Sequence, residues 1–257
     1  MPGADGWTEV GAMAEERSEL SLDEAVELTR TGDVWVFRGR SVPDRAIQFT
    51  TNSPVNHVGM SVVIEDLPPL MWHAELGRSL PDMWSGSHHR GVQLHDLRDA
   101  VRVWGIRYGQ RAWLRQLEPP ADDEMENGVL RTIARLDGTP FPSTAQLGWR
   151  WLRGRAPAMR RRPNDRTLNP SPPEPRGAHT PRPTVRSDAA QREVEKGSLE
   201  TAYCAEVVAA TYQAMGLLPA GRRPNWYDPG RFWSGDDLEL SAGRRLGNEI
   251  SVRIPAR

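Results

Sequence analysis

Hydrophobic and polar positions along the chain predict a mixed α+β protein. Short runs rich in β-branched and aromatic residues favour strands. Five runs share this composition: 34–39, 55–64, 70–77, 91–97 and 101–108. The second and third runs are separated by a turn over 66–69, so we expect them to pair as a hairpin. The alternating segment 250–255 predicts a further strand at a sheet edge.

Two segments carry helix signals instead. Ser21 followed by Glu24 matches a capping box, which predicts a helix to about Thr29, before Gly32 and Asp33 end it. Segment 122–138 repeats apolar residues at spacings of four and three, as expected for an amphipathic helix. Those apolar residues are Met125, Val129, Ile133 and Leu136.

A third helix contains the sole cysteine of the chain, Cys204. Thr201 is a suitable N-cap, and the helix is expected to run to about Met215. Gly216 suits the position after the helix end, and Pro219 prevents its continuation. The apolar residues of this helix predict one buried stripe: Ala205, Val208, Ala209 and Tyr212.

Composition divides the chain into one domain and an insertion. Residues 1–20 are expected to be a flexible arm, and 21–153 together with 198–257 to form one domain. Between Arg155 and Arg186 lie eight prolines and eight arginines but only two acidic residues. Such a segment buries too little apolar surface to fold, so 154–197 is predicted to be a disordered, Arg/Pro-rich insertion. It serves either as a tolerated surface loop or as a contact for an anionic partner.

Charge and cysteine content exclude several classes of protein. The net charge of −1 gives no general attraction to nucleic acid, and one cysteine excludes an intramolecular disulfide framework. The polar N-terminal segment lacks the features of a secretory signal, and no run approaches the ~18 apolar residues of a membrane span. We therefore expect a cytoplasmic protein, with a basic, tryptophan-containing segment at 147–162 as the candidate for peripheral membrane contact.

Cys204 has the position expected of an activated thiol. The first turn of a helix offers unpaired N–H groups and a positive dipole end, which lower a thiol pKa and stabilise an oxyanion. The alternative is a small buried side chain that only packs, which is common for cysteine.

Two histidines and a glutamate are the candidate partners of this thiol. His57 opens a predicted strand, and His73 lies on the next strand, where Glu75 shares its face. A base needs a third polar group to fix its ring orientation, and His73 or Glu75 would supply it. The alternatives are core histidines, a solvated glutamate, or a zinc site of His57, His73 and Cys204. We expect no metal and no cofactor.

Six short segments, taken in order, resemble the circularly permuted NlpC/P60 family, the permuted papain-like group that includes the YiiX/YaeF-like C92 peptidases. Their sequences are TGDVWVFRG, SPVNHVGMSVVI, LMWHAELG, GVQLHDL, LDGTPFPS and AYCAEVV. In this family the cysteine helix follows the strands, which explains why histidine precedes cysteine here. The resemblance implies an α+β permuted papain-like fold, in which a small antiparallel β-barrel or sheet packs against the cysteine-bearing helix.

The resemblance also implies roles for individual residues. Cys204 corresponds to the nucleophile and His57 to the general base. The third member of the site precedes Ala74; it is usually a glutamate in YiiX-like relatives and a histidine in acyltransferase-like relatives. His73 occupies that position here, so it is our choice, with Glu75 in reserve.

The residues beside the nucleophile give a weaker correspondence. Tyr203 is a candidate for shaping the oxyanion site, or else a packing residue. Ala205 stands where the family usually has serine, a departure from its pattern.

The implied reaction is hydrolysis or acyl transfer on an amide or ester through a thioester intermediate. A small peptide, an amide or a lipid acyl group is the expected substrate, and no nucleic acid partner is expected. The alternative is a non-catalytic binding module on the same fold.

Overall fold

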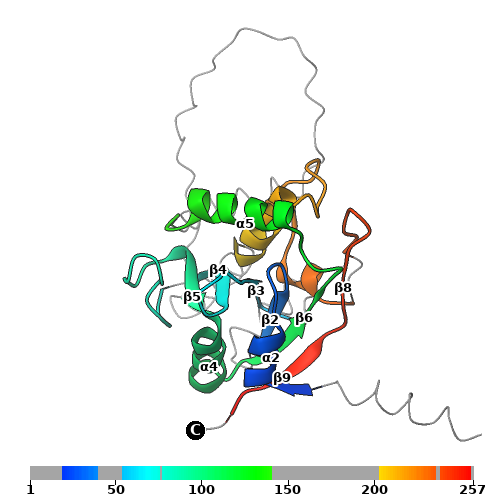
Figure 1. The fold of residues 1–257 in the computed structure, drawn as a ribbon. Helices are drawn as coiled ribbons and strands as arrows, with labels where there is room; N and C mark the ends of the chain where they lie inside the picture. Colours follow the sequence, from blue (N-terminus) through cyan, green and yellow to red (C-terminus); the bar gives the residue numbers. More distant parts are fainter. Residues whose placement is uncertain (1–18, 40–53, 76, 141–202, 236–237, 256–257) are drawn as a thin grey trace, which may run out of the picture.

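The computed structural model describes residues 19–39, 54–75, 77–140, 203–235 and 238–255. These residues form a mixed α+β structure in which helices cover both faces of a central sheet (Figure 1). The predicted α+β class is therefore confirmed.

The central sheet has seven strands in the order β1-β9-β6-β2-β3-β4-β5, and β7 pairs with β8 in a separate two-stranded sheet. Neighbouring strands of the seven-stranded sheet pair antiparallel, except β1 and β9, which pair in parallel. This order leaves the sheet open, so the described residues form a sheet and no closed barrel. The strands are β1 (Glu19–Ser21), β2 (Val34–Arg38), β3 (His57–Val62), β4 (Leu70–Glu75), β5 (Gly91–Asp96), β6 (Arg111–Arg115), β7 (Leu117–Glu118), β8 (Arg245–Leu246) and β9 (Ile250–Arg253).

Each face of the sheet has its own apolar core. Helices α2 (Leu22–Leu28) and α4 (Leu97–Tyr108) pack on one face, against Trp35 and Phe37 among others. Helix α5 (Asp123–Leu136) and the helix over 203–214 pack on the other. We call these the α4 face and the α5 face. Because side chains alternate along a strand, each strand contributes to both cores.

The capping box predicted at Ser21 and Glu24 is present. Ser21 accepts a hydrogen bond from the backbone of Glu24, whose carboxylate accepts from the backbone N–H of Ser21, completing the capping box of α2. Helix α5 includes the predicted apolar stripe, of which Met125, Val129 and Ile133 are buried. The Cys204 helix is followed by Gly216, whose φ of +73° suits a residue just past a helix end.

The prediction of a strand over 101–108 is wrong, because this segment belongs to helix α4 (Leu97–Tyr108). Asp96 caps the helix by accepting from the N–H of Asp99, and Gly109 ends it with φ +64°. Its buried residues are Leu97, Ala100, Val101 and Trp104. These residues recur at the spacing of a helix, but Leu97 falls in one predicted strand (91–97) and Val101 and Trp104 in the next (101–108). Because the apolar residues were divided between two predicted strands, their helical periodicity was not recognised.

The strand that follows α4 was not predicted. β6 occupies a central position between β2 and β9. The strand predicted over 250–255 exists as β9, but it is not at an edge, because β1 pairs with it in parallel. Residues 19–20 of the expected flexible arm thus belong to the sheet.

Two hydrogen bonds anchor the Cys204 helix to the sheet. The hydroxyl of Tyr212 donates to the carbonyl of Gly32 at 2.6 Å, and the indole N–H of Trp72 donates to the hydroxyl of Thr211 at 3.0 Å. Both contacts are buried. They hold the helix against β4 and against the turn that precedes β2, with Cys204 at the opposite end of the helix.

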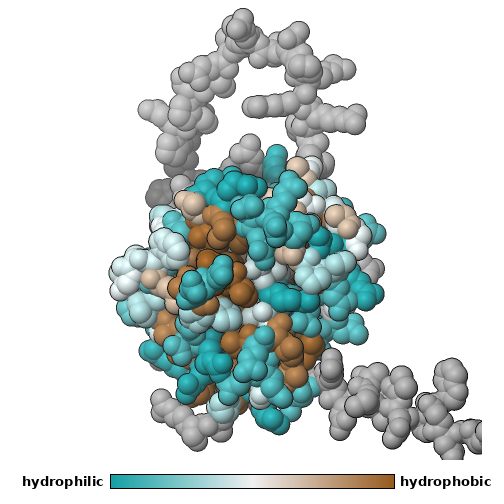
Figure 2. Space-filling view, in the orientation of Figure 1, coloured by the Kyte–Doolittle hydropathy of each residue, from teal (hydrophilic) through white to brown (hydrophobic). Residues whose placement is uncertain are grey.

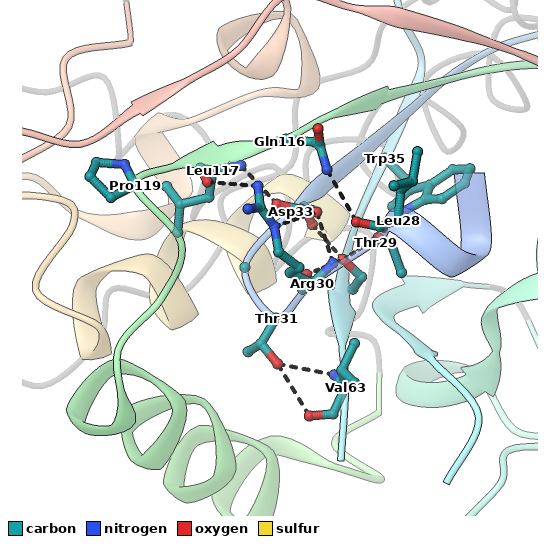
Figure 3. A network of polar contacts seen from close by, with 12 residues as sticks. Leu28, Thr29, Arg30, Thr31, Asp33, Trp35, Val63, Gln116, Leu117 and Pro119 are labelled. Carbon is teal, nitrogen blue, oxygen red and sulfur yellow. Dashed lines mark hydrogen bonds and ion pairs between the residues drawn. The ribbon is translucent and has the colours of Figure 1, made fainter. Parts of the chain in front are cut away.

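The turn before β2 is held by a buried carboxylate, Asp33 (Figure 3). Asp33 accepts from the N–H of Arg30 at 2.8 Å and from the N–H of Leu117 at 2.8 Å. Nearby, the hydroxyl of Thr31 donates to the carbonyl of Val63 and accepts from its N–H. These bonds connect the α2–β2 turn to β7 and to the end of β3. Burial, the largest cause, raises the pKa of Asp33 to about 6.

The visible surface is mainly hydrophilic, with apolar areas between (Figure 2). Large exposed apolar side chains come from several elements, including Leu28 of α2, Tyr108 of α4 and Leu130 of α5. Single exposed residues of this kind are common in globular proteins. Within the described residues, none of the helices is both long enough and apolar enough to cross a bilayer.

Several sequence-based expectations fall outside the described residues. These are the arm over 1–18, the N-cap at Thr201, the basic segment over 147–162 and the insertion over 154–197. They stay predictions.

Candidate functional site

Cys204 lies in the first turn of its helix, as predicted, and is fully buried in the core of the α5 face. The backbone N–H groups of Val58, Ala205 and Cys204 itself face the sulfur. Such donors favour the thiolate. Burial nevertheless raises the pKa of Cys204 to about 12, because loss of hydration outweighs these bonds. The expected lowering of this pKa is therefore wrong for this structure.

The sulfur contacts β3 where that strand separates from β4. The β3–β4 pairs begin at Met60 opposite Trp72 and extend away from His57. Val58 therefore pairs with β2 but lies beyond the β3–β4 pairs, and its N–H faces Cys204. This contact places the thiol at the residue that follows His57 in the chain.

His57 approaches the same point from the α4 face. It pairs directly opposite Phe37, and its ring packs on Trp104 with centroids 4.9 Å apart. Alternation along β3 puts the side chains of His57 and Val58 on opposite faces. Thiol and imidazole thus approach neighbouring residues of β3 from the two faces of the strand, and their catalytic pairing stays a prediction.

The histidines themselves form a hydrogen-bonded chain. His57 Nε2 lies 3.2 Å from His73 Nδ1, and His73 Nε2 lies 3.1 Å from His95 Nδ1. His95 Nε2 lies 3.2 Å from the Oε1 of Gln93. Of the two candidates for the third member of the site, His73 is the one that contacts His57.

His95 and Gln93 were missed by the sequence analysis. Both lie on β5, where Gln93 pairs opposite His73 and His95 opposite Met71. The signal was available, because Gln93 and His95 are two apart in a predicted strand and therefore share one face. Which strand would lie beside His73 could not be read from that spacing.

All three imidazoles are neutral at physiological pH. Burial, the largest cause in each case, lowers the pKa of His57 to about 4, that of His95 to about 4, and that of His73 well below its usual range. Repulsion between the histidines acts in the same direction. A neutral imidazole has one N–H and one lone pair, so each ring donates at one nitrogen and accepts at the other.

Glu75 lies on the α4 face beside His73, as predicted. Both of its carboxylate oxygens lie 2.6 Å from the hydroxyl of Ser79, and burial raises the pKa of Glu75. Tyr203 is buried in the same core as Cys204.

One group of these side chains has the composition of a metal site. Ligand atoms of His73, Glu75 and His95 lie within 4.8 Å of one another. Two imidazoles and a carboxylate suit a transition metal. All four ring nitrogens of His73 and His95 take part in hydrogen bonds, so an ion would have to displace at least one of these contacts. The zinc triad considered from the sequence, with Cys204, is a different set of residues.

Comparisons with known proteins give little support for an assignment. No protein-family model and no curated protein matches the sequence. Among solved structures, the chain is similar to metalloprotein yiiX from Escherichia coli O157:H7, with 22% sequence identity and a TM-score of 0.33. The match covers 45% of this chain and 54% of that protein, so this chain spans about half of its length. A similarity at this level assigns neither a family nor a function to this chain.

Proposed function

We propose that the chain is a cysteine-dependent hydrolase or acyltransferase that acts on an amide or ester through a thioester of Cys204. One observation carries this proposal: the Cys204 sulfur lies at the N–H of Val58, next to His57, whose ring is held through Nε2 by His73. A nucleophile, a base and a group that orients the base are the parts that acyl transfer requires.

In the proposed reaction, Cys204 Sγ bonds to the substrate carbonyl carbon while its proton passes to His57. The leaving amine or alcohol takes this proton as the carbonyl–heteroatom bond breaks, which leaves a thioester. Water or another acceptor then attacks the thioester, and His57 accepts its proton and returns it to the sulfur. Backbone N–H groups at the helix start, beside Tyr203 and Ala205, are suited to stabilise the oxyanion.

The resting pair is a neutral thiol and a neutral imidazole. Burial raises the pKa of Cys204 to about 12 and lowers that of His57 to about 4, so a preformed thiolate–imidazolium pair is disfavoured. We therefore propose that the proton moves during the attack. Cys204 is fully buried, and the His57 side chain starts from the other face of β3. The proposal therefore requires a local opening of the structure that admits substrate and brings the sulfur and the imidazole together.

The test uses intact-mass spectrometry of purified protein mixed with activated acyl esters of short and long chain. Because Cys204 is the sole cysteine, one added acyl mass that Cys204→Ala abolishes identifies the thioester. We expect His57→Gln to slow acylation by about 100-fold or more, the usual contribution of a general base. His88→Gln, at an exposed histidine, is the matched control and should acylate normally. Undiminished turnover in Cys204→Ala would refute the proposal.

One observation favours the alternative of a non-catalytic binding module. A fully buried thiol with a raised pKa is also what a purely structural cysteine shows. In that case no donor acylates the folded protein, and Cys204→Ala retains the fold with unchanged ligand binding.

A further inference from the structure

Gln93 lies at the end of the histidine chain, and its amide has only one favourable orientation. Its Nε2 faces three backbone carbonyl oxygens, those of Glu75, His89 and Gly91, at 3.5, 3.2 and 3.4 Å. Reversing the amide would place Oε1 against these three acceptors, which is unfavourable. The carbonyl oxygen of Gln93 must therefore face His95 Nε2, as the 3.2 Å contact has it.

This orientation favours one protonation pattern for the three rings of the chain. Since Gln93 Oε1 only accepts, His95 Nε2 has the proton and His95 Nδ1 has the lone pair. The 3.1 Å contact then requires His73 Nε2 to donate, which leaves His73 Nδ1 as an acceptor. The 3.2 Å contact requires His57 Nε2 to donate in turn. His57 is left with an unprotonated Nδ1.

We propose that Gln93 and His95 are positioning residues that fix His57 in the Nε2-protonated tautomer and so present its Nδ1 as the base. The role of His57 as a base rests on the proposed function, whereas the assignment of the tautomers rests only on the hydrogen bonds described above. His57 is the only ring of the three that is partly exposed, so the lone pair lies on the histidine closest to solvent.

The same arrangement supports a protonated His57. When Nδ1 takes a proton, Nε2–H continues to donate to His73 Nδ1, so the imidazolium keeps its hydrogen bond and no ring has to turn. With the opposite tautomers, His57 would present an N–H to the incoming proton donor and no base would be available. Gln93, which is connected to His57 through His95 and His73, thereby determines whether His57 can act as a base.

The test reads the tautomers directly by long-range ¹H–¹⁵N NMR on protein with ¹⁵N-labelled histidine. In the unaltered protein near neutral pH, we expect His57, His73 and His95 to be neutral and protonated at Nε2. His57→Gln, His95→Asn and the exposed His88→Gln assign the signals. A proton on His57 Nδ1 would overturn the proposal without any substitution.

Two matched variants separate positioning from packing. Gln93→Met keeps the length of the side chain and removes the acceptor, so Nδ1-protonated rings should appear at His95, His73 and His57. His95→Asn places an amide oxygen near the position of the lost Nδ1, so His73 and His57 should keep their tautomers. A folded Gln93→Met protein with all three tautomers unchanged would remove Gln93 from the mechanism; if that variant does not fold, the unaltered protein and His95→Asn decide.

Activity provides a second readout. Gln93→Met should slow acylation of Cys204 at least tenfold, because His57 Nδ1 then loses its lone pair, while the control His88→Gln, at an exposed histidine outside the chain of rings, should acylate at the rate of the unaltered protein. Expected tautomers without any acylation would refute the proposed enzyme and leave the positioning role intact. Stoichiometric Zn²⁺ binding that removes the His73 Nε2 proton would instead identify a metal site and overturn the proposal.

Discussion

Alkylation of Cys204 in the folded protein should be much slower than alkylation of an ordinary thiol. The thiolate is the reacting species. Burial raises the pKa of Cys204 from 9.0 to about 12, despite the opposing effect of the nearby backbone N–H groups of Val58, Ala205 and Cys204 itself. The folded protein therefore contains very little thiolate near neutral pH.

The expected factor follows from the two pKa values. At about pH 8, a pKa of 12 instead of 9.0 leaves about 1000-fold less thiolate, because each pH unit below the pKa reduces the ionised fraction tenfold. Burial of the sulfur also obstructs the reagent, so about 1000-fold is a lower bound for the slowing.

The assay follows iodoacetamide addition by intact mass, with folded protein and with protein in concentrated guanidinium chloride. Only one position reacts as a thiol, so each molecule gains one increment. In the folded protein the rate should rise about tenfold per pH unit past pH 9, whereas the unfolded chain should reach a plateau near its ordinary pKa.

Equal rates in the two states near pH 8, within about tenfold, would refute the reasoning. A plateau of the folded protein below pH 9 would do the same and would restore the lowered pKa expected from the helix start alone. Either result would favour a thiolate–imidazolium pair over the neutral pair proposed above.

Other predictions concern the scaffold of the site. The pKa of Asp33 is raised from 3.8 to about 6 in the folded state, so the folded protein binds this proton more tightly than the unfolded chain does. The free energy of unfolding should therefore fall by up to ~3 kcal/mol as the pH rises from about 4 to about 6. Urea unfolding at several pH values should show this slope, and Asp33→Asn should flatten it. Thr211→Val leaves the buried indole N–H of Trp72 without its acceptor. The free energy of unfolding, measured in urea, should fall by ~1–3 kcal/mol. An unchanged urea midpoint would contradict the anchoring role. Tyr212→Phe removes the buried bond to the Gly32 carbonyl and should cost ~1–2 kcal/mol, lowering Tm by roughly 2–4 °C per kcal/mol in calorimetry, and a Tm equal to that of the unaltered protein would show that water replaces this bond.

The sequence determined most of the local structure. The capping box at Ser21 and Glu24 and the stripe of α5 rest on contacts within one or two turns, so the pattern suffices to predict them. The pairing of β3 with β4 follows from the short turn between them. Alternation alone places His73 and Glu75 on one face.

The strand order and the environment of each group depended on tertiary structure. The place of β9 between β1 and β6 is set by which apolar faces meet, and segments far apart in the chain leave no local signal for this. α4 was taken for a strand because its apolar residues also fit a short run of β-branched and aromatic type.

For the site, the sequence supplied the side chains, and folding decided their chemistry. Cys204 at a helix start indicated an activated thiol, yet its pKa is governed by burial, which depends on everything packed around it. His95 and Gln93 became part of the site because β5 lies beside β4. Hydrogen-bond partners and hydration are properties of the assembled core, so no pattern along the chain contains them.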